Sequence, residues 1–546
     1  MKEKLKKSDM PIFPSFKYLK SLIEKKDTFL LVSIAVLLTI LWGYKINLSQ
    51  SLWSDALPYA AWFNDRTLFS NDLFAACFSF IPTVFYPVFS LVSRSLGTLN
   101  ALIIFLFFQN MAIVFATYYL AKVLFREKKT AYLSILWVVL AGGLRYGLGA
   151  ISPAGISIIP SLLAIPLLLL AISFYLENHF FLLFLTLAFS AYLHLSLTFL
   201  TGVIIFFSFL LLTRKIDEWK KLFPGFLVAL ILTLPLFFWV INLHYSPGGD
   251  LPFEQWMNLM RLRSSWHSFP SKFGYSQWIP FLFLLALWTF FLKIKMKSVY
   301  EKKIIFLCMS IFLLFFLGTI FTEIFPTRLV IAIIPFRVTF IFVVIVFIYL
   351  SNFLIKIFEK KKKTLFDLIF LTGFLLIFLP LLVVRINTIP ALRFFDFNNF
   401  PKVSVYSFVE RQRDKDWLDV QYWVSKNTPK EKLIIVPPYL REFRAYSERG
   451  IVLSWEDAIY PIYYPHTGKE VMRRLTDYGI DPANFRDNTE ADNALKNSFL
   501  KFTEKDFTRI AEKYDVSFAV VEKTKTLLFP EFYHNESFRV YQIKPD

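Results

Sequence analysis

The chain has 546 residues, of which 56% are hydrophobic and only 18% are charged. A soluble domain carries roughly 25% charged residues, so this composition excludes a soluble enzyme and an intrinsically disordered protein. The apolar residues form long runs before residue 385, and the remainder has the composition of a soluble domain. The sequence therefore predicts a polytopic α-helical membrane protein with a C-terminal extracytoplasmic α/β domain.

The net charge of +19 is distributed unevenly along the chain. Residues 385–546 carry 25 Lys and Arg against 24 Asp and Glu, so the basic surplus lies elsewhere, in short loops between the apolar runs. Basic loops that alternate with loops poor in Lys and Arg are typical of membrane proteins, in which they set the topology. They also suit anionic membrane lipids as partners. No nucleic-acid partner is expected.

Eleven apolar segments predict about 11 transmembrane helices, where one crossing needs about 20 residues. The segments lie at 28–46, 99–121, 131–149, 156–176, 180–194, 197–213, 222–243, 277–292, 304–322, 329–355 and 365–384. The stretch from Phe180 to Leu212 must cross twice in 33 residues, with His194 near its middle. We expect two short, tilted or partly re-entrant helices there.

Two groups of lysines predict the orientation. Eight lysines precede the first segment, and the run Lys360–Lys363 precedes the last, so both flanks are expected in the cytoplasm. The prediction is a multi-pass protein of the cytoplasmic (inner) membrane, with its N-terminus inside and its C-terminal domain outside. The expected domains are a basic N-terminus (1–27), a transmembrane domain (28–384) with an extracytoplasmic loop at 47–98, and the extracytoplasmic domain (385–546).

The C-terminal domain shows alternating helix and strand patterns. Residues 416–427 have helical spacing, and Thr503 precedes two acidic residues that favour a helix start. Short apolar runs at 432–436, 451–453, 517–521 and 538–543 predict strands. A small α/β sandwich follows from this order. None of the predicted strands leads into a glycine-rich phosphate loop, so no nucleotide cofactor is predicted.

Three segments carry a family resemblance: residues 53–59 (WSDALPY) through 68–72 (LFSND), residues 335–337 (PFR), and residues 423–429 (WVSKNTP), which run on to Phe443-Arg444 and to 447–449. With the predicted topology, the chain resembles the GT-C superfamily of membrane glycosyltransferases, particularly bacterial members without an assigned activity. The resemblance implies a sugar donor linked to polyprenyl phosphate and an acidic residue in the first outward loop. Many GT-C enzymes have two adjacent acids there. Here Asp55 follows Ser54, and the nearest acids in the sequence are Asp65 and Asp72.

Asp55 is the candidate catalytic base. If 55–66 is helical, Asp55, Tyr59, Trp62 and Arg66 share one face, and an aromatic environment raises the pKa of a carboxyl group. Such a carboxylate can accept a proton from an acceptor hydroxyl or amine. Alternatively, Asp55 and Asp65 hold a divalent cation (Mg or Mn) that neutralises the leaving phosphate.

The three aspartates also have structural interpretations. Asp55 could cap an interfacial helix, and Asp72, a possible second acid or metal ligand, lies where a helix cap is favoured. Asp65 could form a surface ion pair with Arg66.

Arg337 is the candidate ligand of the donor phosphate. It follows Pro335 inside an apolar segment, where a charge must face a cavity or a partner. A guanidinium binds phosphate well through two parallel hydrogen bonds. The alternatives are an ion pair with Glu323 or a side chain that reaches the interface. Arg145, in the segment GGLRYG, is a second phosphate candidate.

Five further residues are candidates for acceptor binding or for lining the site: His194, Arg261, Arg263, Arg444 and Arg449. His194 could instead be a buried, hydrogen-bonded histidine. The arginines of the 244–276 loop could be interfacial anchors, and Arg444, Ser447 and Arg449 could lie in a solvated loop. The histidines lack metal-ligand spacing, so zinc is not expected.

Three functions fit this sequence. The leading hypothesis is a glycosyltransferase that moves a sugar from a polyprenyl-phosphate donor to an unidentified extracytoplasmic acceptor. The second is a non-catalytic envelope protein that binds a glycan or a partner. The third is a transporter for a lipid-linked substrate, which the absence of a visible internal repeat disfavours.

Overall fold

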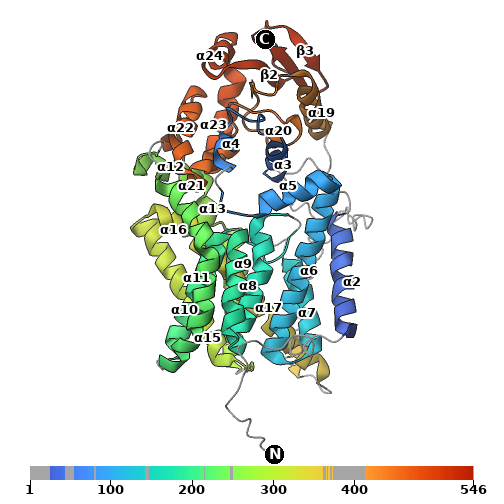
Figure 1. The fold of residues 1–546 in the computed structure, drawn as a ribbon, viewed down its shortest axis with the longest axis vertical. Helices are drawn as coiled ribbons and strands as arrows, with labels where there is room; N and C mark the ends of the chain where they lie inside the picture. The colour runs from blue at the N-terminus through green and yellow to red at the C-terminus, as the bar shows by residue number, and fades with distance from the viewer. Residues whose placement is uncertain are drawn as a thin grey trace, which may run out of the picture.

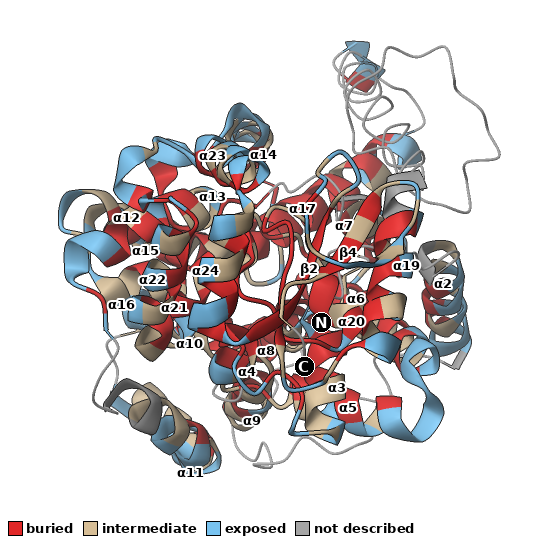
Figure 2. Cartoon of the chain, turned by 90° about the horizontal axis from the view of Figure 1, so that it is seen from above, coloured by how far each residue is buried: buried red, intermediate tan, exposed pale blue. Residues whose placement is uncertain are grey.

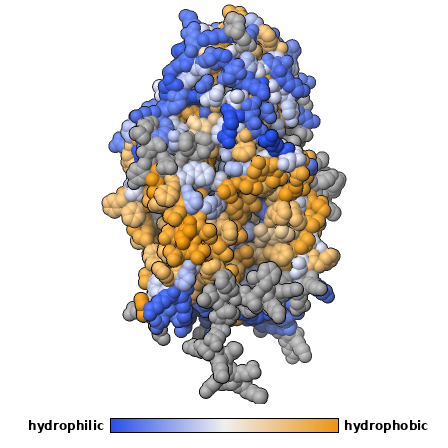
Figure 3. Space-filling view, viewed as in Figure 1, coloured by the Kyte–Doolittle hydropathy of each residue, from blue (hydrophilic) through white to orange (hydrophobic). Residues whose placement is uncertain are grey.

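The computed structural model describes residues 25–43, 55–78, 81–141, 147–155, 157–213, 216–245, 250–294, 296–360 and 412–544, and a few residues between 364 and 372. Within these ranges the apolar segments form an elongated helical bundle, and the C-terminal elements cover one end of it (Figure 1). We call this the capped end. The bundle surface carries broad apolar areas, whereas the C-terminal region is largely hydrophilic (Figure 3).

Ten of the eleven predicted apolar segments coincide with helices, and most of segment 365–384 lies outside the described residues. The helices are α2 (Lys25–Gly43), α6 (Thr98–Phe125), α7 (Lys128–Ala141), α8 (Pro160–Glu177), α9 (Phe180–Leu193), α10 (Leu195–Leu212), α11 (Ile216–Tyr245), α14 (Tyr275–Lys293), α15 (Glu301–Thr319) and α17 (Thr339–Glu359). Among the described residues, seven candidate spans are long and apolar enough to cross a membrane. The chain is therefore a membrane-embedded protein with a polytopic helical fold.

Helices differ in how much of their surface faces other helices. Viewed from the capped end, α2 and α11 lie at the rim and are mainly exposed, whereas α8 and α17 are largely buried (Figure 2). Exposed apolar side chains such as Phe226, Ile231 and Phe238 cover α11. In a bilayer these side chains face lipid, so their exposure in the isolated chain carries no cost there.

The predicted continuous segment 329–355 is wrong in one respect, because the helix is interrupted. It consists of α16 (Arg328–Ile333), the 3₁₀ turn η4 (Pro335–Val338) and α17. Ile334 adopts a left-handed conformation with φ of 53°, and Pro335 has no N–H to continue the helical hydrogen bonds. The break places Arg337 in a short turn at the start of α17.

The stretch of 33 residues with His194 forms two helices, as predicted. α9 and α10 meet at His194, whose backbone is extended. The end of α9 is bound by the segment that precedes α5 (Phe85–Leu96): Val84 N–H donates to Tyr192 O (2.9 Å), and the Thr83 hydroxyl donates to Leu193 O (2.8 Å). The junction thus lies beside the loop that contains Asp55.

Short helices fill the space between the bundle and the C-terminal region. The first group is α3 (Ala56–Asn64), α4 (Leu73–Phe78) and α5, and the second is α12 (Phe253–Arg263), α13 (Ser265–Ser268) and η2 (Pro270–Lys272). α3 contacts α20 (Phe443–Ser447) of the C-terminal region, and α4 contacts α21 (Tyr460–Tyr463). These contacts join the two parts of the chain at the capped end.

The C-terminal region contains one four-stranded sheet in the order β1-β2-β4-β3. The strands are β1 (Leu433–Ile435), β2 (Val516–Glu522), β3 (Glu531–His534) and β4 (Phe538–Gln542); β1 and β2 are parallel, and the other pairs are antiparallel. The surrounding elements are α19 (Gln412–Asn427), η6 (Trp455–Ile459), η7 (Pro465–Thr467), α22 (Gly468–Asp477), η8 (Pro482–Asn484), α23 (Asn488–Lys501) and α24 (Glu504–Tyr514), besides α20 and α21.

Most predicted elements of this region are confirmed. Thr503 and Asp506 form a capping box at the start of α24. The predicted strand 451–453 is wrong: only Ile451 makes an isolated bridge, with Ile434, because Ser454 then caps η6. The sequence did not predict β3, whose residues are mostly exposed and lack an apolar face.

Candidate functional site

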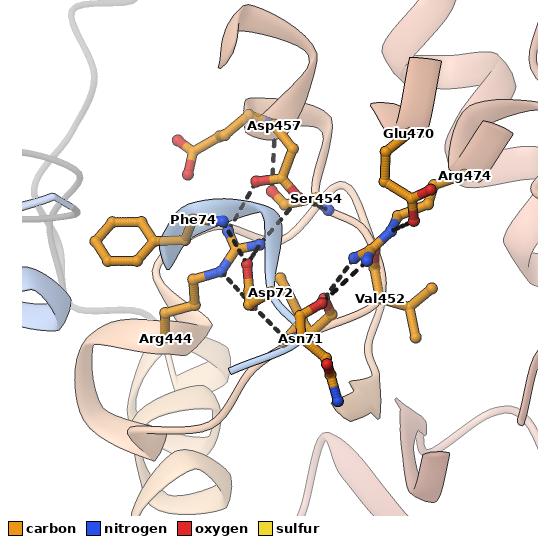
Figure 4. Close-up of polar contacts among 11 residues, drawn as sticks. Asn71, Asp72, Phe74, Arg444, Val452, Ser454, Asp457, Glu470 and Arg474 are labelled. Atoms are coloured by element: carbon orange, nitrogen blue, oxygen red, sulfur yellow. Dashed lines mark hydrogen bonds and ion pairs between the residues drawn. The ribbon is translucent and has the colours of Figure 1, made fainter. Parts of the chain in front are cut away.

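A buried arginine joins the loop after α3 to the C-terminal region (Figure 4). Arg444 of α20 donates from Nε to Asp72 Oδ2 and forms an ion pair from its second terminal nitrogen to Oδ1, both at 2.8 Å. The same guanidinium makes a bidentate contact with Asp457, at 2.8 and 3.0 Å. All three side chains are almost inaccessible to water, so this Asp–Arg–Asp cluster is a fully paired buried ion network.

Asp72 also binds the backbone on both sides of this junction. It accepts from Phe74 N–H (2.7 Å), as expected for a residue that precedes a helix, and from Ile451 N–H (2.7 Å). Arg474 adds a second connection, because it donates to Asn71 O (3.0 Å) and to Val452 O (2.7 Å) (Figure 4). The loop and the C-terminal region are therefore held together by charged and backbone hydrogen bonds.

The interpretation of Arg444, Ser447 and Arg449 as a solvated loop is wrong, because all three residues are buried. Arg449 binds the C-terminal end of α19: its guanidinium donates to Ser425 O (2.6 Å) and Thr428 O (2.7 Å). A cation is favourable where helix carbonyls lack partners, so this contact is a helix cap. Both arginines thus have structural partners.

Asp55 occupies the N-cap position of α3, but its side chain makes no capping hydrogen bond. The carboxylate is exposed, and the helix behind it is apolar. Tyr59 is buried one turn further on and stacks on Tyr86 with a ring separation of 5.1 Å. Trp62 packs edge-on against Tyr59 and carries the Arg66 guanidinium 3.5 Å above its ring. Tyr59, Trp62 and Arg66 therefore form one continuous face.

Tyr463, at the end of α21, connects the candidate residues of the two parts of the chain. Its side chain is 48% exposed, yet burial is the largest cause that raises the pKa of its hydroxyl. The positive charge of Arg337 opposes this rise, the negative charge of Asp55 adds to it, and Arg263 also opposes it. Tyr463 is therefore within electrostatic range of Asp55, Arg337 and Arg263.

The neighbouring tyrosines support this placement of Asp55. Burial raises the pKa of Tyr86 and of Tyr460, and the charge of Asp55 contributes to both increases. Asp55 therefore faces a group of phenols that comes from α5 and α21.

Arg337 is positioned by two segments that lie far away in the sequence. One terminal nitrogen of its guanidinium lies 3.4 Å from His267 Nδ1, and that Nδ1 lies 2.8 Å from Gly149 O. Because a carbonyl oxygen only accepts, His267 Nδ1 carries the proton and donates to Gly149. Gly149 has φ of +71°, and a Cβ there would lie 3.2 Å from Arg337 N and from His267 O. Only glycine permits this close approach without strain.

The guanidinium of Arg337 has further capacity for a ligand. Its Nε is buried and has no hydrogen-bond partner among the described residues. Its charge also acts on His194, at the α9–α10 junction. Glu323, the alternative partner predicted for Arg337, instead accepts from Ser271 N–H (2.9 Å). Arg145 lies outside the described residues.

The described aspartates do not fit the expected divalent cation. α3 separates Asp55 from Asp65 by about 15 Å along its axis, at 1.5 Å per residue. Each carboxylate oxygen that binds a divalent cation lies within about 2.6 Å of the ion, so the two aspartates cannot share one. Asp65 binds Thr67 and Lys430 rather than Arg66, and hydrogen bonds from Thr67 are the largest cause that lowers its pKa to about 2. Among the described residues, no three His, Cys, Asp or Glu side chains form a metal-binding group.

Arg261 and Arg263 differ in their surroundings. Arg261 is exposed on α12, whereas Arg263 donates to Asn488 Oδ1 (2.9 Å) and lies 5.3 Å from the Trp455 ring. The sequence did not identify Tyr463 as a site residue. Its only signal is the tyrosine-rich segment 460–464, which has no recognisable motif.

Comparisons with known proteins give a small sequence match and a fold-level match. Residues 415–462 match the family described as a domain of unknown function (DUF6798). No curated protein matches the sequence.

Two solved structures of ArnT from Cupriavidus metallidurans have similar folds. The structure bound to undecaprenyl phosphate is 10% identical with a TM-score of 0.46, and the match covers 97% of this chain and 99% of that one. The apo structure is 10% identical with a TM-score of 0.41, over 94% of this chain and 97% of that one. At this level the likeness concerns the fold and assigns no residue or activity. By its own helices and strands, the chain is a polytopic helical membrane protein with a C-terminal region built around a small sheet.

Proposed function

We propose that the protein is a GT-C-like glycosyltransferase that moves a sugar from a polyprenyl-phosphate donor to an acceptor on the outer side of the membrane. One observation carries this proposal: Asp55 and Arg337, which lie far apart in the sequence, both act on the half-exposed Tyr463. A carboxylate and a guanidinium near the same residue, at the end of apolar helices, suit the transfer of a sugar from a lipid phosphate.

The two residues have complementary roles in the proposed reaction. Asp55 accepts the proton from the acceptor hydroxyl or amine as that atom attacks the anomeric carbon of the donor. The bond between the anomeric carbon and the phosphate oxygen breaks, and its electron pair leaves with the polyprenyl phosphate. Arg337 stabilises the negative charge that develops on this phosphate. His267 and Gly149 pack closely against Arg337 and limit where it can lie.

The proposed orientation follows from the basic residues of the sequence. The N-terminus is in the cytoplasm, and the C-terminal region is outside the cytoplasmic membrane. The capped end then lies at the outer surface, where Asp55 meets acceptors. Accessibility labelling of single cysteines tests this: Asp515→Cys should react in intact cells and Asp217→Cys only after lysis, and the reverse pattern would refute the orientation.

Arg337→Ala is expected to remove a co-purifying polyprenyl phosphate. A charged hydrogen bond contributes about 1.5–3 kcal/mol, so lipid retention should fall at least about tenfold. Native mass spectrometry of the purified protein measures the bound lipid. Arg473→Ala, which removes a half-exposed arginine paired with Glu470, is the control and should retain it. Equal retention in both variants would show that Arg337 does not bind the donor.

The lone acid also supports a second candidate, a non-catalytic envelope protein on the same fold. The two nearest acids in the sequence do not form a pair with Asp55 such as many GT-C enzymes use, since Asp65 binds Lys430 and Asp72 binds Arg444. A transporter is the third candidate. Incubation of the purified protein with a radiolabelled polyprenyl-phosphate sugar and an envelope extract separates these functions. Labelled glycan supports the enzyme, and flux without covalent change supports the transporter. If neither is observed, the binding protein is supported.

A further inference from the structure

Four charged side chains near the candidate site have no role in the proposed transfer step, and one of them, Arg263, acts on Tyr463. They are Arg263 of α12, Arg441 in the segment before α20, Glu456 of η6 and Asp492 of α23. α12 contacts both η6 and α23, so this four-charge cluster lies where the membrane region meets the C-terminal region. It adjoins the candidate site because the charge of Arg263 acts on Tyr463.

The four-charge cluster is poorly paired. Within the described residues, its one ion pair joins Arg441 Nε to Glu456 Oε1 at 3.6 Å. Asp492 is influenced by the charges of Arg441, Arg263 and Lys496 without an ion pair in the described part of the chain. Arg263 donates to Asn488, but its Nε is buried and has no acceptor among the described residues. The guanidinium of Arg444, by contrast, makes its contacts at 3.0 Å or less.

The two carboxylates of the cluster are also partly desolvated. Burial is the largest cause that raises the pKa of Glu456 and that of Asp492, although Arg441 and Arg263 oppose both increases. Charged groups that are removed from water usually acquire close partners. The buried Nε of Arg263 and the partly desolvated carboxylates of Glu456 and Asp492 have fewer close contacts than Arg444, and a bound ligand would supply more.

We propose that the four-charge cluster binds the acceptor and that this acceptor is a neutral, hydroxyl-rich glycan. The inference rests on the proposed transferase function. The charge of Lys496, one turn further along α23, also acts on Asp492, so the cluster offers guanidinium and ammonium donors together with two carboxylate acceptors. Each sugar hydroxyl both donates and accepts, and it can therefore bond to carboxylates and guanidinium groups alike. The half-exposed ring of Tyr463 offers a flat apolar surface for one face of a sugar.

A glycan array tests this inference without the donor, so the result does not depend on whether transfer occurs. The full chain, labelled and held in lipid nanodiscs, is applied to neutral gluco-, galacto- and manno-oligosaccharides and to their phosphorylated and carboxylated counterparts. The wild type is expected to bind neutral glycans. Arg441→Gln and Glu456→Gln should each lower that signal at least about tenfold, because each removes charge-assisted hydrogen bonds. Arg473→Gln, on the surface of α22, should retain it.

Three outcomes would overturn the proposal: no glycan binding by the wild type, binding of acidic glycans alone, or full binding by both site variants. The Arg441 side chain is 51% exposed, so its replacement is expected to leave the fold intact. An unchanged thermal unfolding midpoint of each variant shows that a lost signal reflects the site. If the array succeeds and the radiolabelled transfer assay fails, the glycan site stands and the transferase function falls.

Discussion

Asp55→Asn is expected to lower the rate of sugar transfer by about 10²–10⁴-fold, the usual contribution of a positioned general base. Asparagine keeps the size of the side chain but cannot accept the proton of the acceptor. The N-cap of α3 should not suffer, because the carboxylate makes no capping hydrogen bond and Asn is an equally good cap. The loss should therefore appear in the rate constant of transfer, with an unchanged thermal unfolding midpoint.

The matched control for this substitution is Asp515→Asn. Asp515 is exposed, pairs with Lys432 at the surface and has a left-handed backbone that Asn tolerates well. Transfer by this variant should equal that of the wild type. The measurement is turnover of the radiolabelled donor under single-turnover conditions. If Asp55→Asn retained the wild-type rate while donor and acceptor were both bound, Asp55 would not be the base.

Arg444→Ala is expected to destabilise the protein by about 3–5 kcal/mol. The substitution leaves Asp72 and Asp457 buried without their shared cation, and an uncompensated buried charge carries a cost of that size. The thermal unfolding midpoint of the purified full chain should fall by several degrees. Arg473→Ala is the control, since a partly exposed ion pair contributes only about 0–1 kcal/mol.

The effect of Arg444→Ala should depend on Asp72. In a double-mutant cycle, Asp72→Asn removes one of the two buried charges that Arg444→Ala leaves unpaired, and it should recover part of the lost stability. Asn keeps an oxygen for the N–H groups of Phe74 and Ile451, so this replacement is the mildest available. Strictly additive losses in the cycle would contradict a direct coupling between Arg444 and Asp72.

The membrane helices were predictable because their signal is local. A run of about 20 apolar residues specifies a helix wherever it lies in the chain, since the backbone in lipid must satisfy its own hydrogen bonds. The cap at Thr503 and the helix at 416–427 were equally readable. The break at Ile334 was not predicted, because the residues around it are as apolar as a continuous helix. The turn depends on the packing of Pro335 and Phe336 against Gly318, which is distant in the sequence.

The sequence by itself determined the polytopic membrane class, the α/β character of the C-terminal region and the candidacy of Asp55 and Arg337. It could not determine which polar residues meet. Arg444 and Arg449 looked like a solvated loop, and they are buried because their partners, Asp72 and the end of α19, come from elsewhere in the chain. Tyr463 comes within range of the charges of Asp55 and Arg337 only through the packing of segments that are distant in the sequence. Hydropathy is a property of each segment, whereas pairing and desolvation depend on contacts between distant segments, which only the tertiary structure decides.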